Sequence, residues 1–191
     1  MRVTILNGAA EGDALTGRVA AALINLLQAK GCDVEQIRLE EVEIAPCLGC
    51  FGCWVKTPGI CVIDDAGRDV AKRAIRCELL AFVTPITFGG YGFQLKKAVD
   101  RLIPLITPYF QFIDGEIHHQ KRYARYPALL GAGTLSQPNE VQEHLFGTLI
   151  RRNAINFHSP HHAAAVVCPQ HEERKVNKEL GTVLRQLEVA Q

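Results

Sequence analysis

The sequence predicts an α/β protein in which helices cover both faces of a doubly wound, five-stranded parallel sheet. Short apolar runs alternate with longer segments of helical periodicity, which is the pattern of repeated strand–helix–strand units. One run, Glu78–Val83, has almost no polar break after its first residue, as expected of a parallel strand buried on both faces. Of the 191 residues, 48% are hydrophobic and 21% are charged, as in ordinary globular domains. No linker, low-complexity tract or repeat divides the chain, so we expect a single domain over residues 1–191.

The amino-terminal part contains two predicted strands and the helix between them. The apolar run Arg2–Leu6 stops at the turn dipeptide Asn7-Gly8, which predicts a strand followed by a turn. Over Ala14–Lys30 the apolar residues recur at helical spacing, and Gly31 is the expected stop signal. Asp33–Leu39 predicts a second strand with one face partly exposed.

The middle of the chain predicts two helices around a third strand, which is the buried run described above. The pair Asp64-Asp65 opens a helix that continues to about Arg76, because acidic residues are favoured at the positive end of a helix. A second helix is expected from Phe93 to about Leu102, where Pro104 disturbs it.

The carboxyl-terminal part predicts two further strands, each followed by a helix. These elements are, in order, Pro127–Gly131, Asn139–Asn153, Ala163–Cys168 and Glu172–Leu187. Two connections, residues 40–63 and 107–126, are longer than a simple link between a strand and a helix. Because long loops in compact α/β domains are more often functional than accidental, both are candidates for a site.

The charge balance excludes some classes of partner. Lys and Arg total 21 and Asp and Glu total 20, a net charge of +1, so there is no basic field for nucleic acid and no polybasic membrane anchor. Neither a signal-peptide pattern nor a run of about 18 apolar residues occurs, so we expect neither secretion nor a membrane span. Seven cysteines, an odd number, then favour the reducing cytoplasm and a metal or catalytic role over disulfides.

Four of the seven cysteines gather in a loop insertion at about residues 44–63. A short glycine-containing loop lets successive sulfurs converge on one cuboidal cluster, and a flexible turn supplies the fourth. The C-x2-C-x2-C-x7-C spacing therefore favours a [4Fe–4S] cluster held by Cys47, Cys50, Cys53 and Cys61. Zinc sites usually use two separated C-x2-C arms and not three closely spaced cysteines followed by a fourth, so zinc is the second interpretation. A loop of reduced thiols that binds nothing is the third. Trp54, inside this loop, either shields a cluster or fills the loop's own core.

The other three cysteines have a different setting. Cys32, Cys77 and Cys168 lie next to or within predicted core elements. A free cysteine in a core behaves as a small apolar residue, so we expect all three to be inert.

Three loops follow predicted strands at the edge of the sheet where parallel α/β folds bind ligands. Residues 7–17 lead into a helix whose backbone N–H groups and dipole suit a phosphate. Residues 84–92 offer apolar side chains and exposed peptide groups that suit a flat ring, and Phe88 and Tyr91 either border such a ring or pack the loop. Residues 131–134 form the third loop. Glycine-rich turns of this kind are weak signals when taken alone.

A resemblance to a known family adds to these patterns. The order of elements, the cysteine loop ending in Asp64-Asp65 and the stretch TPITFGGYGFQLKKAVDR from Thr84 to Arg101 resemble the flavodoxin-like NAD(P)H-dependent flavin reductases, and among them the iron–sulfur flavoproteins. The resemblance covers nearly the whole chain. It implies a flavodoxin-like sheet of order 2-1-3-4-5, FMN on the loops after strands one, three and four, and NAD(P)H as co-substrate. It also implies a homodimer or homotetramer in which a neighbouring subunit brings its cluster close to the flavin. The FMN contacts that it implies are Gly8, Ala9, Thr16, Pro85, Ile86, Thr87, Phe88, Gly89, Gly90, Tyr91 and Gly133.

The phosphate loop, residues 7–17, departs from the family pattern. Where the family typically reads Gly-Ser-Pro-Arg-x-x-Gly-Asn-Thr, this chain keeps Gly8 and Thr16, lacks the serine and arginine, and adds Glu11 and Asp13. A like charge at about 4 Å costs about 4 kcal/mol at an effective dielectric constant of 20 and about 1 kcal/mol in bulk water. Either cost is a substantial part of the roughly 8 kcal/mol in a micromolar complex. Backbone donors and Arg18 are the groups that would compensate.

Three functional hypotheses follow. The first is a flavin-dependent oxidoreductase whose FMN passes electrons between NAD(P)H or a protein donor and a small acceptor or an iron–sulfur cluster. Its partners are then a small redox substrate or an electron-transfer protein, with no role for nucleic acid or membrane. The second is a non-enzymatic binding or assembly module with an impaired FMN site and a structural metal or thiol loop. The third is a thiol redox sensor that uses the cysteines from Cys47 to Cys61.

Overall fold

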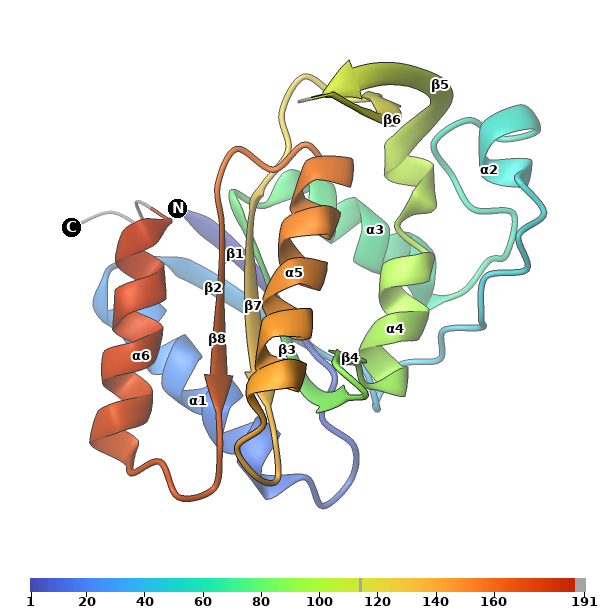
Figure 1. Ribbon diagram of the computed structural model, residues 1–191. Coiled ribbons are helices and arrows are strands. Elements are labelled where there is room, and N and C mark those ends of the chain that lie inside the picture. The colour runs from blue at the N-terminus through green and yellow to red at the C-terminus, as the bar shows by residue number, and fades with distance from the viewer. Residues whose placement is uncertain (114, 188–191) are drawn as a thin grey trace.

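The central sheet grows from apolar runs that bury both of their faces. In the computed structural model, which describes residues 1–113 and 115–187, the first six residues of β3 (Leu79–Thr87) are all buried. β3 pairs in parallel with β1 (Arg2–Asn7) on one side and β7 (Ala128–Thr134) on the other. β2 (Asp33–Arg38) and β8 (His162–Val167) complete the edges. The order β2-β1-β3-β7-β8 (Figure 1) confirms the predicted flavodoxin-like order, with β7 and β8 as the fourth and fifth predicted strands.

Helices cover both faces of this sheet and divide the core into two layers. On one face, α1 (Ala14–Ala29) and α6 (Glu173–Gln186) pack their apolar stripes against the strands. On the other face lie α3 (Ala66–Arg76), α4 (Phe93–Asp100) and α5 (Glu140–Asn156). The doubly wound arrangement is therefore confirmed. Among the helices of the described residues, none is both long and apolar enough to cross a bilayer.

The end of β3 differs from the sequence prediction. The strand continues to Thr87, past the predicted end at Val83. A two-residue strand, β4 (Gly90–Tyr91), folds back on it in antiparallel pairing, so that Ile86 faces Tyr91. Sequence reasoning placed this whole stretch in a loop, because a strand of two residues is too short to show periodicity.

The prediction of a loop over residues 107–126 was wrong for most of its length. After a short 3₁₀ turn, η1 (Ile103–Leu105), the chain forms an antiparallel hairpin of β5 (Ile106–Ile113) and β6 (Glu116–Lys121). Gly115, with φ 83°, lies in the turn and supplies a conformation that other residues adopt only with strain. The pairing register shifts between Ile106 and Phe110, which breaks the simple alternation that would have revealed the strand.

The long connection between β2 and α3 carries the cysteines away from the ligand-binding edge of the sheet. It contains one short helix, α2 (Gly52–Val55). Figure 1 shows α2 near the β5–β6 hairpin at one end of the molecule, while the loops that follow β1 and β7 lie at the opposite end. Within one chain, α2, which carries Cys53, and the phosphate loop are therefore far apart.

Candidate functional site

The phosphate loop is anchored to the strand beside it. The N–H of Gly8 donates to the Val83 carbonyl at 2.7 Å, and the N–H of Ala9 donates to the Asn7 side chain at 3.0 Å. A Cβ on Gly8 would lie 2.9 Å from the Cβ of Leu95 at the start of α4. Only glycine fits this position, because both neighbours are fixed by their own elements. The loop therefore has a defined path past the end of β3.

Asp13 explains one departure of this loop from the family pattern. Its carboxylate accepts the N–H of Thr16 at 3.0 Å and caps α1, a role in which aspartate is strongly favoured. The hydroxyl of Thr16 is fully buried and lies 2.6 Å from the hydroxyl of Thr134. Both polar groups of Thr16 are thus engaged within the protein. Glu11, the other added acid, is exposed.

Replacing Asp13 with asparagine is expected to strengthen FMN binding about tenfold. Asparagine caps helices as well as aspartate does, so the change removes the charge and keeps the cap. One like charge near a phosphate costs between about 1 and 4 kcal/mol, and tenfold corresponds to about 1.4 kcal/mol. Fluorescence titration of FMN measures the effect. Glu11→Gln is the control and should gain less, because its charge faces solvent. Equal gains in both variants would show that Asp13 has no special position.

The turn between β3 and β4 presents one aromatic side chain to solvent. Phe88 has φ 52° and is 95% exposed, so it is both strained and unpacked. Gly89 follows it with φ 79°, and its N–H donates to the side chain of Gln142 at 3.3 Å. A Cβ on Gly89 would lie 2.7 Å from the Cβ of Leu145. The turn is therefore held against α5, and Phe88 projects from it.

Tyr91 has the opposite setting. Its ring is buried, 5.7 Å from that of Phe82 and 6.1 Å from that of Phe146, both in edge contact. Its hydroxyl accepts a hydrogen bond from Asn153 at 2.7 Å. Burial raises the pKa of Tyr91 far above its usual value, although the bond from Asn153 opposes this. The sequence left open whether Phe88 and Tyr91 border a flat ring or pack the loop. Tyr91 packs in the core, and Phe88 remains exposed.

The prediction of a loop over residues 131–134 was wrong: β7 continues to Thr134, so Gly133 lies within a strand that is buried along its whole length. A Cβ on Gly133 would lie 2.6 Å from the Cδ1 of Ile86 and 3.0 Å from the ring of Phe146. The missing side chain makes room for Ile86 beneath the turn. The remaining predicted contacts in the turn, Pro85, Thr87 and Gly90, belong to the paired residues of β3 and β4 or lie beside them. The structure thus brings together the loops that follow β1 and β3 and the end of β7.

The four cysteines of the loop differ in burial, and only one of them is buried. Cys53 is buried, Cys61 is half-buried, and Cys47 and Cys50 are exposed. Burial raises the pKa of the Cys53 thiol, and the negative charges of the three other cysteines raise it further. Among the described residues, no three histidine, cysteine or acidic side chains are gathered closely enough to hold a metal ion. Four cysteines are the donor set of a [4Fe–4S] cluster, and their sulfurs would have to lie closer together than they do in this structure to hold one.

Trp54 ties the cysteine loop to the β5–β6 hairpin. Its indole N–H donates to the carbonyl of Ile106 at 3.0 Å. Its ring stacks on Phe51 at 5.2 Å and lies 5.0 Å from the ring of His119 on β6. These contacts match the interpretation that Trp54 fills the core of the loop. They also give the hairpin, which sequence reasoning missed, a structural role beside the cysteines.

Sequence reasoning also missed a buried arginine under the same loop. Arg101, at the end of α4, donates to both carboxylate oxygens of Asp65 at 2.8 Å. Burial alone would raise the pKa of Asp65, but the bonds from Arg101 and from two backbone N–H groups outweigh it, and the pKa is lowered. The sequence offered Asp65 only as a helix start. The pairing spans 36 residues and has no local signature.

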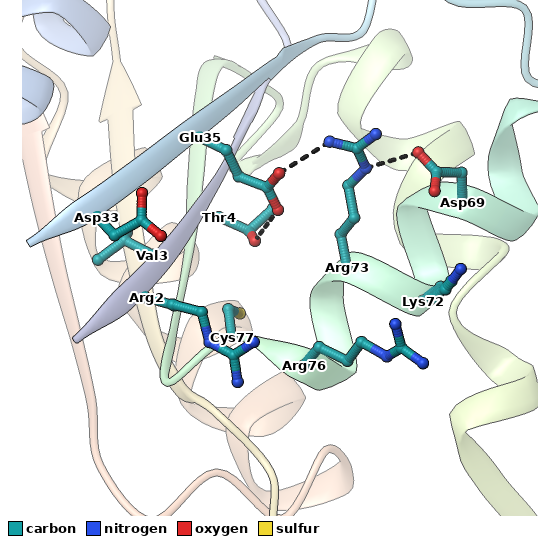
Figure 2. Close-up of a pocket in the computed structure, with 10 residues that line it drawn as sticks. All are labelled: Arg2, Val3, Thr4, Asp33, Glu35, Asp69, Lys72, Arg73, Arg76 and Cys77. Carbon is teal, nitrogen blue, oxygen red and sulfur yellow. Dashed lines mark hydrogen bonds and ion pairs between the residues drawn. The ribbon is translucent and has the colours of Figure 1, made fainter.

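The cavity drawn in Figure 2 lies at the amino ends of β1 and β2, opposite the strand ends that form the candidate site. It measures about 270 Å³ and is lined by the first residues of β1 and β2 and by one side of α3. Figure 2 shows Arg73 between Glu35 and Asp69, bonded to both. Burial raises the pKa of Cys77, in the same lining, to about 11, so this thiol is unreactive at neutral pH. We therefore assign this cavity no part in the site at the strand ends.

Comparisons with known proteins fit this arrangement. Residues 1–166 match the family described as NADPH-dependent FMN reductase. Iron-sulfur flavoprotein MJ1083 of Methanocaldococcus jannaschii is 30% identical over 105 residues, 55% of this chain and 53% of that protein. The iron-sulfur flavoprotein of Methanosarcina thermophila is 24% identical over 105 residues, 55% and 54% of the two chains. This chain thus spans about half the length of the curated relatives that it matches.

Solved structures share the fold across almost the whole chain. The NAD(P)H:quinone oxidoreductase from Methanothermobacter marburgensis has a TM-score of 0.69 at 14% identity and covers 97% of this chain and 94% of its own. An FMN-dependent NADH-azoreductase from Bacillus anthracis, solved with FMN, has a TM-score of 0.66 at 12% identity and covers 98% and 99%. At such low identity these neighbours show the fold alone. Since the family match extends over residues 1–166 of 191, this chain belongs to the NADPH-dependent FMN reductase family.

Proposed function

We propose that this protein is a flavin-dependent oxidoreductase that uses FMN and NAD(P)H, or a protein electron donor, to reduce a small acceptor or an iron–sulfur centre. The observation that carries the proposal is the convergence of the loops after β1 and β3 with the end of β7 in a member of this family. When bound, FMN supplies hydride and single-electron transfer, and the protein positions it. No side-chain acid or base is needed for that step.

The residues of the site have distinct tasks in this proposal. Backbone N–H groups of the phosphate loop and the start of α1 would hold the phosphate, apart from those of Gly8, Ala9 and Thr16, which have partners within the protein. The exposed peptide groups of the β3–β4 turn border the ring, and Phe88 covers its apolar face. Gly8 and Gly133 act indirectly, because they let the neighbouring loops approach one another.

We further propose that Cys47, Cys50, Cys53 and Cys61 hold a [4Fe–4S] cluster and that electrons reach it from the flavin of a second copy. Both curated relatives are named iron–sulfur flavoproteins. The part of the cysteine loop in α2, with Cys53, lies at the opposite end of the molecule from the phosphate loop (Figure 1), which favours transfer between subunits. Exposed apolar side chains surround the loop and the hairpin, as expected of a surface buried in a homodimer or homotetramer. They include Leu48, Val55, Tyr109, Phe110, Phe112 and Ile117.

One observation favours the non-enzymatic alternative. The carboxylate of Asp13 already occupies the start of α1, where a phosphate would otherwise accept the free N–H groups. This arrangement is sufficient for a binding or assembly module, because such a module does not depend on tight FMN binding. In that case the cysteine loop would hold zinc or a structural cluster.

Anaerobic purification with flavin, iron and sulfide assays tests both parts of the proposal. We expect flavin absorption bands and equal amounts of iron and sulfide. Cys53→Ala should abolish iron and keep the flavin, whereas Cys168→Ala, a buried cysteine outside the loop, should keep both. Absence of both flavin and iron, also after reconstitution, would overturn the oxidoreductase proposal. Flavin with zinc in place of iron would overturn the cluster alone.

A further inference from the structure

The strand β8 leaves one edge of the central sheet open. It pairs with β7 on one side, and within residues 1–113 and 115–187 no strand pairs with its other side. Figure 1 shows β8 at this edge of the sheet, with α6 on one side of it and α5 on the other. A groove of about 530 Å³ follows the edge, with residues 164–166 as its floor and the two helices as its walls. The edge can therefore be reached by a second extended chain.

Every second residue of β8 turns its peptide groups toward this groove. At the end of the strand, the N–H of Leu135 donates to the Val167 carbonyl at 3.0 Å, so the peptide oxygen of Val167 faces β7. Because peptide groups alternate in direction along a strand, the residues at even-numbered positions direct their N–H and C=O groups away from β7. These residues are His162, Ala164 and Val166. Their backbone groups are strong donors and acceptors that a pairing strand would satisfy.

The two edges of the sheet differ in their protection against such pairing. The edge strand β2 carries Asp33, Glu35 and Arg38, and charged side chains discourage pairing with another chain. The sequence of β8 is HAAAVV, without a lysine, an acidic residue or a proline. Edges of this composition are usually covered in native proteins. The contrast with β2 therefore indicates that β8 is an interaction surface.

The backbone of β8 fits a second copy of the same strand. With a twofold axis at Ala164, two β8 strands lie antiparallel, and His162 of each copy is opposite Val166 of the other. Outward-facing residues then meet only outward-facing residues, and each opposed pair exchanges two hydrogen bonds. The alanines at the centre of the strand place no bulky side chain at the axis.

The helix α5 is complementary in charge to itself about the same axis. Glu143, Gly147 and Arg151 follow one another at four-residue intervals, so they lie on successive turns of the helix. Glu143 and Gly147 line the groove, and Arg151 is exposed one turn further on. Two α5 helices that meet antiparallel at Gly147 bring Glu143 of each copy to Arg151 of the other. This symmetry of charge favours a second copy over an unrelated strand.

We propose that this protein forms a twofold dimer in which two β8 strands pair antiparallel and join the two sheets into one. The proposal goes beyond the proposed function, because it requires neither flavin nor a cluster. Its surface shares no residue with the exposed apolar side chains around the cysteine loop and the hairpin. An additional interface at those side chains would combine with this one in a larger assembly.

Analytical ultracentrifugation of the full chain tests the proposal. We expect Ala164→Pro to sediment with half the wild-type mass, because it removes an outward N–H and leaves the bonds to β7 in place. Gln36→Pro is the matched control on the other edge strand. The N–H of Asp33 faces β1, where it donates to the Met1 carbonyl at 2.9 Å, so the N–H of Gln36 faces outward by the same alternation. This control should keep the wild-type mass.

Charge reversal on α5 tests the dimer without a change in the strand, and it decides the matter if Ala164→Pro does not fold. Glu143→Arg should raise the dissociation constant about tenfold, because it places like charges opposite each other. Adding Arg151→Glu should restore the wild-type value. Hydrogen exchange locates the interface: the outward amides of Ala164 and Val166 should be protected in the wild type and exchange faster in Glu143→Arg.

Three results would overturn the inference. The first is a wild-type chain that sediments as a single copy, which would leave the β8 edge to an extended segment of another protein. The second is a folded Ala164→Pro variant with the wild-type mass. The third is a double charge reversal that binds as weakly as Glu143→Arg. Loss of flavin or iron is read in separate assays and would refute the proposed function alone.

Discussion

Asp65→Ala is expected to lower the free energy of unfolding by about 3–5 kcal/mol, the usual cost of leaving one partner of a buried ion pair alone. The side chain of Arg101 is 0% exposed and that of Asp65 is 13% exposed, so water cannot replace the lost carboxylate. The same change removes the acceptors for the N–H groups of Ala45 and Gly67. Urea unfolding measures the loss.

Asp100→Ala is the control for this prediction. Asp100 pairs with Lys96 on the same helix that carries Arg101 at its end, but both side chains are about half exposed. Exposed pairs of this spacing contribute about 0.3–0.5 kcal/mol. A loss of similar size in both variants would contradict the claim that the buried pair stabilises the fold.

The ion pair of Asp65 and Arg101 makes the free energy of unfolding depend on pH. The pKa of Asp65 is lower in the folded protein than the value of about 3.9 expected for the unfolded chain. Its contribution is therefore fully present above that value and is lost as the pH falls through the lower folded pKa. Wild-type stability should decline in this acidic range, and Asp65→Ala should decline less steeply.

Gly8→Ala is expected to weaken FMN binding at least tenfold and to destabilise the fold by about 1–3 kcal/mol, as is usual for overpacking. The added Cβ would lie 2.9 Å from the Cβ of Leu95, 3.2 Å from the Leu95 nitrogen and 3.3 Å from the Val83 carbonyl oxygen. Two of these three atoms are backbone, so the loop must move. FMN titration and thermal unfolding measure the two effects.

Gly147→Ala serves as the control for the added methyl group. Gly147 lies inside α5, and a Cβ there would meet nothing within 4 Å. Alanine stabilises helix interiors relative to glycine by up to about 1 kcal/mol, so a small gain is expected with unchanged FMN affinity. If Gly8→Ala behaved like Gly147→Ala, the phosphate loop would have more freedom than its contacts indicate.

The sheet was predictable because its signals are local. A buried strand such as β3 shows itself as a continuous apolar run, and the helices between strands keep their 3.6-residue spacing. The β5–β6 hairpin was not predictable in this way. Its register shift breaks the alternation, and it packs on the cysteine loop through Trp54, a contact between residues far apart in sequence.

The candidate site was predictable only as a location. Its three loops follow from the rule that ligands bind at the carboxyl ends of parallel strands. Which polar groups remain free does not follow, because the Thr16 hydroxyl is engaged by Thr134, 118 residues away. The composition of the loop likewise indicated two unfavourable acids. In the folded protein, Asp13 caps a helix while Glu11 faces solvent.

Arg101 donates to carbonyl groups at both ends of the cysteine loop, and these contacts bear on what happens when the loop loses a bound group. Asp65 and Arg101 join Ala45 to Ile63 without using any cysteine, so the sheet does not depend on what the loop contains. If the loop binds the cluster proposed above, a chain that loses its iron should therefore keep its melting temperature and accept a new cluster. Reloading would then need neither refolding nor new synthesis, because the contacts at the base of the loop stay in place.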